Sequence, residues 1–150
     1  MEPSTGEKMI FIGQDLLSVS DYISDCANCP TPTGIATYVN LANVLLSGNN
    51  GALGWAQNGQ PLGIDIDWGG GPLNAHSAAV GFPNSAVQIG LYLVGETDNI
   101  AGGGRDAEIR HMASFFNALS DTAFYLRVGY EFDGQWNGYS VQVTSMRIEE

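Results

Sequence analysis

The chain has 150 residues, of which 44% are hydrophobic and only 14% are charged, and this balance is the opposite of that in disordered proteins. We therefore expect one folded domain with a core of its own. The formal net charge is −11, from 5 Lys and Arg against 16 Asp and Glu. Nucleic-acid binding and anionic-membrane binding both need clustered Lys and Arg, so the charge excludes both and favours a neutral polar ligand. The apolar runs are all far shorter than the ~18 residues of a membrane helix.

The first half of the chain predicts two strands and one helix. Residues 1–8 are polar and predict a flexible lead-in. The apolar run at 9–12 predicts a buried strand, and the Cys-, Pro- and Asn-rich residues 20–34 predict a loop. At 35–46 apolar residues recur near one face at helical spacing, which predicts a helix ended by the Gly- and Asn-rich segment after it. A second strand is expected at 62–67.

The second half predicts two further strands and the clearest helix of the chain. The Gly-rich residues 69–72 open a long loop or a short helical region, and 87–94 predict a third strand. Asp106 is expected as a helix N-cap. After it, apolar residues recur along one face of 106–119, which predicts an amphipathic helix. The fourth strand is expected at 123–128.

The order of these elements predicts the fold class. Apolar strands that alternate with helical segments are typical of parallel α/β sheets with right-handed crossovers. No linker divides the chain, so residues 1–150 are expected to form one domain, with an atypical tail at 140–150. We therefore predict a (β/α)4 half barrel, or a truncated (β/α)8 barrel, with parallel strands.

The two cysteines form a single CxxC pair, Cys26 and Cys29, in a loop rich in Pro, Thr and Asn. One such pair is too small for a four-cysteine zinc site. A local disulfide is favoured over two free thiols, and it predicts an exported, secreted or periplasmic protein because disulfides persist outside the cytosol.

Acids, amides and aromatic residues gather where the predicted strands end. In parallel α/β proteins the functional groups lie at the carboxyl ends of the strands. This set suits a sugar, because rings stack on its apolar faces while acids and amides bond its hydroxyls. No metal constellation is visible and no cofactor is implied. The candidates are Gln14, Asp65, Asp67, Trp68, Tyr92, Arg127, Tyr130, Glu131, Asp133, Trp136 and Asn137.

The segment 126–137, LRVGYEFDGQWN, is the most informative part of the chain. It resembles the fourth-strand motif of family-26 glycoside hydrolases, the β-mannanase group, in the clan of retaining (β/α)8 glycosidases. Arg127, Glu131, Gly134 and Trp136 match that motif at the same spacing. The resemblance extends over roughly residues 10–139, with weaker matches near the first two predicted strands.

The resemblance implies an enzyme that hydrolyses a β-linked polysaccharide, with mannan first and cellulose or xylan next. Glu131 would be its general acid/base and Arg127 would orient that acid. Tyr130 and Asp133 would shape the site, and Trp136 would stack on a sugar ring. The alternative is that Glu131 simply pairs with Arg127. The remaining expected substrate contacts are Asn137, Trp68, Asp65, Asp67, Gln14 and Tyr92.

The chain departs from the family pattern in two places. The residue before the motif Glu is Tyr130, where the family usually has His. The family's nucleophile is a Glu on the seventh strand, which a half barrel would lack. A second carboxylate could come from Asp15, Asp65, Asp67 or Asp133, or from a second copy in a homo-oligomer that closes an eight-stranded barrel. A sugar-binding half barrel without catalysis, or an inactive fragment, remains the alternative.

Overall fold

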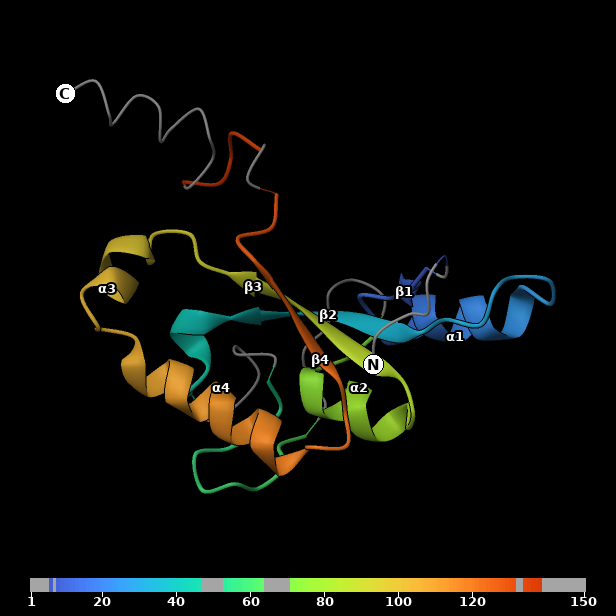
Figure 1. Cartoon of the computed structure of the whole chain (residues 1–150), viewed down its shortest axis with the longest axis horizontal. Coiled ribbons are helices and arrows are strands. Elements are labelled where there is room, and N and C mark those ends of the chain that lie inside the picture. Colours follow the sequence, from blue (N-terminus) through green and yellow to red (C-terminus); the bar gives the residue numbers. More distant parts are fainter. Residues whose placement is uncertain (1–5, 7, 47–52, 64–70, 132–133, 139–150) are drawn as a thin grey trace.

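The fold is an open parallel sheet with helices on one face. A computed structural model of the chain describes residues 6, 8–46, 53–63, 71–131 and 134–138. The strands are β1 (Phe11–Ile12), β2 (Gly34–Asn40), β3 (Ala86–Tyr92) and β4 (Phe124–Val128). They are all parallel and lie in the order β1-β2-β3-β4 (Figure 1). The α/β class and the half-barrel arrangement are thus confirmed, and all the carboxyl ends of the strands lie along one edge.

Within the described residues, four helices accompany these strands: α1 (Leu16–Asp25), α2 (Ala75–Gly81), α3 (Thr97–Ala101) and α4 (Asp106–Ala118). The helices α2 and α4 lie together on one side of the sheet (Figure 1). Local capping explains where two of the helices begin. The Asp15 carboxylate accepts a hydrogen bond from the Ser18 amide at 2.8 Å, and Asn74 with Ser77 forms a reciprocal capping box.

The core lies between the sheet and these two helices. Alternate residues of β2 and β3 point toward the helices and are buried, as the twofold periodicity of a strand requires. Phe115 of α4 is completely buried against them. The opposite face of β2 and β3 carries the other alternate residues, which include Tyr38, Gly90 and Tyr92.

The helix expected at 35–46 is wrong, because the first half of this segment belongs to the strand β2. The β-branched Ile35, Thr37 and Val39 alternate along it, and β1 and β3 satisfy its backbone groups from both sides. The helical spacing of its apolar residues is therefore overridden by sheet pairing. The strand is followed by a 3₁₀ turn, η1 (Leu41–Asn43).

Three smaller expectations also change. The helix α1 occupies the first part of the loop expected at 20–34, and the N-cap of α4 is Arg105 rather than Asp106. Of the strand expected at 62–67, residues 62 and 63 are in no strand and 64–67 lie outside the described residues. β2 and β3 pair directly, so this segment does not separate them. The strands near 9–12, 87–94 and 123–128 and the helix at 106–119 are confirmed.

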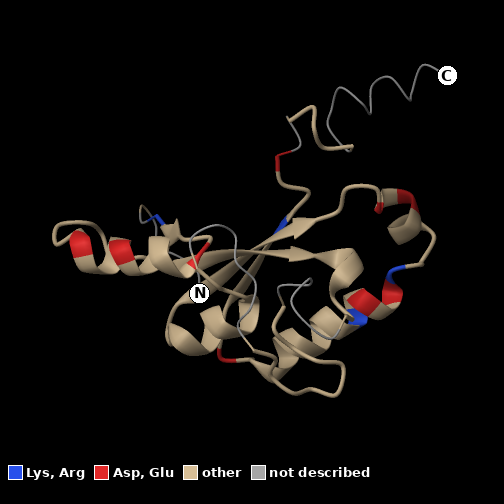
Figure 2. Cartoon of the chain, turned by 180° about the vertical axis from the view of Figure 1, so that it is seen from behind, with Lys and Arg blue, Asp and Glu red and all other residues tan. Residues whose placement is uncertain are grey.

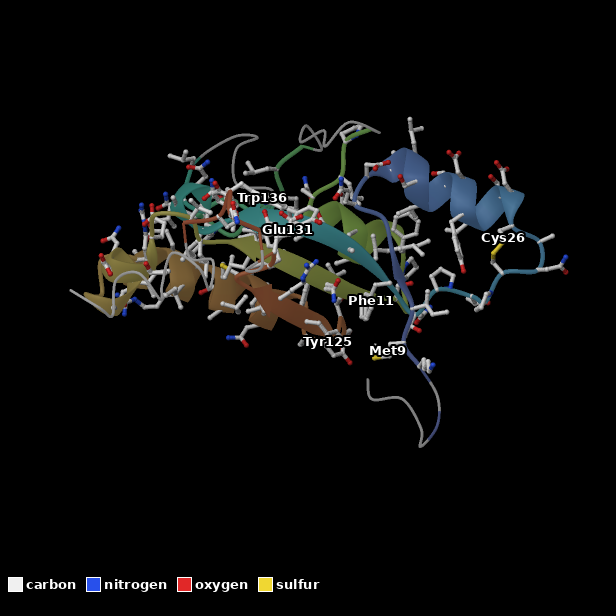
Figure 3. The ribbon with its side chains drawn as sticks, turned by 90° about the horizontal axis from the view of Figure 1, so that it is seen from above. Met9, Phe11, Cys26, Tyr125, Glu131 and Trp136 are labelled. Carbon is white, nitrogen blue, oxygen red and sulfur yellow. A yellow bond between two sulfur atoms is a disulfide. The ribbon has the colours of Figure 1, made fainter. Side chains whose placement is uncertain are left out.

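Cys26 and Cys29 form the expected disulfide just after the end of α1 (Figure 3). Within the described residues, none of the helices is both long enough and apolar enough to span a bilayer. Acidic residues line α1 and gather where α3 meets α4 (Figure 2). At that junction Arg105 forms ion pairs with Glu96 at 2.6 Å and with Glu108 at 2.7 Å.

Candidate functional site

The chain turns sharply as it leaves β4, and Glu131 lies in this turn. Gly129 has a φ of 65° and Glu131 a φ of 56°, so both adopt the left-handed backbone conformation. Asn84 is the other residue besides glycine that does so in the described part of the chain. A side chain makes this conformation unfavourable, and strain of this kind concentrates at functional sites.

Hydrogen bonds from residues 134–137 hold the backbone of Glu131. Its carbonyl oxygen accepts one bond from the Gly134 amide at 2.9 Å and one from Nδ2 of Asn137 at 2.8 Å. Asn137 is only 4% exposed, and its own amide donates to the Gly134 carbonyl at 3.0 Å. The amide group of Asn137, expected to bind substrate, therefore braces the turn that carries Glu131.

The carboxylate of Glu131 is bonded to Trp136. The indole Nε1–H of Trp136 donates to Oε2 of Glu131 at 3.0 Å, and the two side chains lie next to each other in Figure 3. Gly134 lets the indole approach, because a Cβ at this position would overlap the Trp136 ring. Trp136 is 75% exposed, so the outer surface of its ring is open to a ligand.

Arg127 does not pair with Glu131. Among the described ion pairs none joins these two side chains. The guanidinium of Arg127 instead lies 5.5 Å from the centre of the Tyr130 ring, which is a cation–π distance. The structure therefore does not support the alternative that Glu131 simply forms an ion pair with Arg127.

Three tyrosines surround a cleft of about 240 Å³ at the carboxyl ends of β2, β3 and β4. The ring of Tyr130 lies 5.0 Å from that of Tyr38 and 6.3 Å from that of Tyr92, measured between centroids. Val39 and Asn40 complete the lining. Tyr38 and Asn40 were missed in the sequence because their segment was predicted to be a helix. The alternation of β-branched residues in IATYV was the signal that could have revealed them.

The other sequence candidates are not among the residues that line this cleft, or they lie outside the described residues. Gln14 is half-buried after β1, and the neighbouring Asp15 uses both carboxylate oxygens to bond Ser18. Asp65, Asp67, Trp68 and Asp133 lie outside the described residues. In the part of the chain that the structure describes, no three His, Cys, Asp or Glu side chains cluster as metal ligands would.

The chain is similar in sequence to two known glycosidases. The chain is 34% identical over 134 residues to the Beta-1,3-xylanase TXYA of a Vibrio species and equally to a Beta-1,3-xylanase of an Alcaligenes species. Each match covers 89% of this chain but only 25% of the relative, so the chain spans about a quarter of the curated relatives that it matches. No protein-family model matches the chain. These similarities support a relationship to glycoside hydrolases, as the motif around Glu131 implied.

Proposed function

We propose that this half barrel acts as a glycoside hydrolase. It would cleave a β-linked polysaccharide, with Glu131 as the general acid/base. The observation that carries the proposal is the placement of Glu131. It follows β4, the last strand of the parallel sheet, at the edge where α/β enzymes hold their functional groups, in a strained conformation that neighbouring bonds maintain. Any stretch of 134 residues within 150 includes Glu131, so the match to the two xylanases spans it.

In this role Glu131 would first donate a proton to the glycosidic oxygen and then take one from water. The Nε1–H of Trp136 would fix the direction of the carboxylate through its bond to Oε2. Glycosidases use a second carboxylate, ~5 Å away for retention and ~6.5–9.5 Å away for inversion. Asp65, Asp67, Asp133 and a second copy of the chain remain the proposed sources. We also propose that the protein is a member of glycoside hydrolase family 26, which the motif around Glu131 resembles.

Xylan with β-1,3 linkages becomes the first substrate to test, because both relatives are named for it. Mannan, cellulose and β-1,4-xylan follow. The disulfide between Cys26 and Cys29 favours a secreted or periplasmic location, since such bonds persist in oxidising compartments. The second candidate function is carbohydrate binding without catalysis, which the tyrosine-lined cleft favours.

The test is the release of reducing sugar from these four polymers by the natural chain, Glu131→Gln and Asp121→Asn. Glu131→Gln keeps the side-chain shape but removes the titrating proton. Asp121 is an exposed acid in the turn before β4, so Asp121→Asn controls for the loss of one negative charge. Release that is lost only in Glu131→Gln supports the proposal. Equal release by all three proteins removes Glu131 as the acid, and no release from any polymer leaves binding without catalysis.

The outer edges of β1 and β4 have no partner strand among the described residues, since these strands end the sheet. Exposed strand edges favour association. We therefore propose that two copies pair to close the barrel. Light scattering across a range of protein concentrations tests this, and a monodisperse monomer at every concentration would contradict it.

A further inference from the structure

The sheet leaves room for the three tyrosine rings that line this cleft. Gly90 on β3 pairs with Tyr38 on β2 and with Arg127 on β4. A Cβ on Gly90 would lie 2.6 Å from Cδ1 of Tyr38 and 3.3 Å from Cδ1 of Tyr130. Because Gly90 has no side chain, the rings of Tyr38 and Tyr130 can lie across β3, and the cleft opens between them and Tyr92.

The lining of the cleft is neutral and partly polar. Its five residues are Tyr38, Val39, Asn40, Tyr92 and Tyr130, and none of them is Asp, Glu, Lys, Arg or His. Oδ1 of Asn40 accepts a hydrogen bond from the Ala42 amide at 3.0 Å, which fixes the orientation of the carboxamide. Aromatic faces with a few oriented polar groups are typical of sites for small neutral ligands.

One hydrogen-bonded turn carries both Tyr130, which lines the cleft, and Glu131. Tyr130 directly precedes Glu131, and Nδ2 of Asn137 approaches both carbonyl oxygens, at 3.4 Å for Tyr130 and 2.8 Å for Glu131. The ring of Tyr130 and the carboxylate of Glu131 are thus carried by one braced turn. A ligand held against Tyr130 would be held in register with the acid.

We infer that Tyr38 and Tyr92, together with Tyr130, form a binding subsite for one uncharged sugar ring of a β-linked chain. This ring would be the unit next to the bond that Glu131 protonates, so the inference rests on the proposed function. The tyrosine faces would pack on the C–H faces of the sugar, and Asn40 with the phenol hydroxyls would bond its hydroxyl groups. Tyr38 and Asn40 thereby join the site from a strand that the motif does not include.

The test is calorimetric titration with β-1,3-linked xylo-oligosaccharides, and with manno- and cello-oligosaccharides, on the Glu131→Gln protein so that no substrate is consumed. Tyr38→Ala and Tyr92→Ala are added to this background. Tyr38→Phe keeps the ring and removes only the hydroxyl. Tyr22→Ala is the matched control, because Tyr22 lies on α1 and its hydroxyl donates to the Pro30 carbonyl beside the disulfide.

We expect Tyr38→Ala and Tyr92→Ala each to raise the Kd about tenfold or more, as removal of a central aromatic contact does. Tyr22→Ala should leave the Kd unchanged, and Tyr38→Phe should weaken binding less than Tyr38→Ala. An unchanged Kd in both alanine variants, or no binding of any oligosaccharide, would overturn the inference. If Tyr38→Ala does not fold, Tyr92→Ala and Tyr38→Phe decide the same question.

The hydrolysis assay on Glu131 separates this inference from the proposed function. Sugar binding that depends on Tyr38 and Tyr92, in a chain that releases no sugar, keeps the subsite and removes the catalytic proposal. Hydrolysis that depends on Glu131, with a Kd insensitive to both tyrosines, keeps the catalytic proposal and removes the subsite.

Discussion

The aromatic rings of Phe11 and Tyr125 contact each other edge to face, with centroids 5.6 Å apart, although they belong to the first and the last strand of the sheet (Figure 3). Neighbouring strands lie ~4.8 Å apart, so β1 and β4 of a flat sheet would be separated by roughly 14 Å. The Phe11 ring can extend toward β4 because it lies over Gly34 of β2, which has no side chain in its way.

The space beneath these rings depends on Gly34. A Cβ added there would lie 2.5 Å from the Ala86 carbonyl oxygen and 2.5 Å from Cε1 of Phe11. We therefore expect Gly34→Ala to lower the free energy of unfolding by ~1–3 kcal/mol through overpacking. Gly81→Ala is the matched control, because its Cβ would meet nothing within 4 Å. Urea denaturation of both variants measures the effect, and equal midpoints would contradict it.

Asn137 braces the turn that holds Glu131, so its loss should destabilise this turn. Asn137→Ala removes the donor to the Glu131 carbonyl while the site remains buried. We expect the free energy of unfolding to fall by ~0.5–1.5 kcal/mol, the net value of one hydrogen bond, because the Gly134 amide still bonds the Glu131 carbonyl. Asn117→Ala, on the exposed surface of α4, is the control. Thermal unfolding measures the change, and equal losses in the two variants would refute the bracing role.

The ion pair between Arg105 and Glu96 predicts that the fold loses stability in acid. Hydrogen bonds from Arg105 and then from Asn99 lower the pKa of Glu96 from 4.5 to about 2. A carboxyl with a depressed folded-state pKa stabilises the fold above its unfolded pKa and loses this contribution as the pH falls through the folded value. Between about pH 4.5 and pH 2, the natural chain should therefore lose more stability than Arg105→Met does.

Arg110→Met is the matched control for this experiment. Arg110 pairs with Asp106 at 3.5 Å, but both side chains are mostly exposed, so water screens the pair. Its acid sensitivity should equal that of the natural chain in chemical denaturation series at several pH values. If Arg105→Met and the natural chain show parallel losses down to pH 2, the ion pair is not the source of the sensitivity.

The burial of His76 predicts that the stability of the fold also depends on pH in a milder range. Burial lowers the pKa of His76 below 6.5, and its ring packs against Trp55 with centroids 5.5 Å apart. The unfolded chain therefore takes up the proton first, so stability is complete above the unfolded pKa and decreases as the pH falls below about 6.5. His76→Phe keeps an aromatic ring and should flatten the change in Tm between pH 7.5 and pH 5.5. An unchanged slope in this variant would exclude His76.

The sequence correctly predicted those elements whose pattern of apolar residues fits either a helix or a strand but not both. The helix α4 has a long amphipathic pattern, and β3 and β4 are apolar runs bounded by turn residues. The segment 35–46 has two solutions, because its apolar residues fit a helix while Ile35, Thr37 and Val39 also alternate as in a strand. Only pairing with β1 and β3 decides between them, and such pairing involves residues remote in sequence.

The site was predictable where the motif is local and unpredictable where it depends on packing. Glu131 and Trp136 lie five residues apart, and their bond follows from one turn. The contact of Tyr38 with Tyr130 joins a residue of β2 to one in the turn after β4, so no local pattern contains it. Arg127 lies only three residues before Tyr130, but the motif does not indicate whether its guanidinium lies against the Tyr130 ring or against Glu131.

The left-handed backbone of Glu131 implies a trade-off that mutational selection would reveal. Glycine adopts this conformation without penalty, whereas an L side chain costs ~1–2 kcal/mol there. Selection for thermal tolerance alone should therefore favour Glu131→Gly, whereas the role proposed for Glu131 predicts that selection for sugar release preserves the acid. Opposing outcomes of these two screens would measure how much stability the proposed role costs at this position.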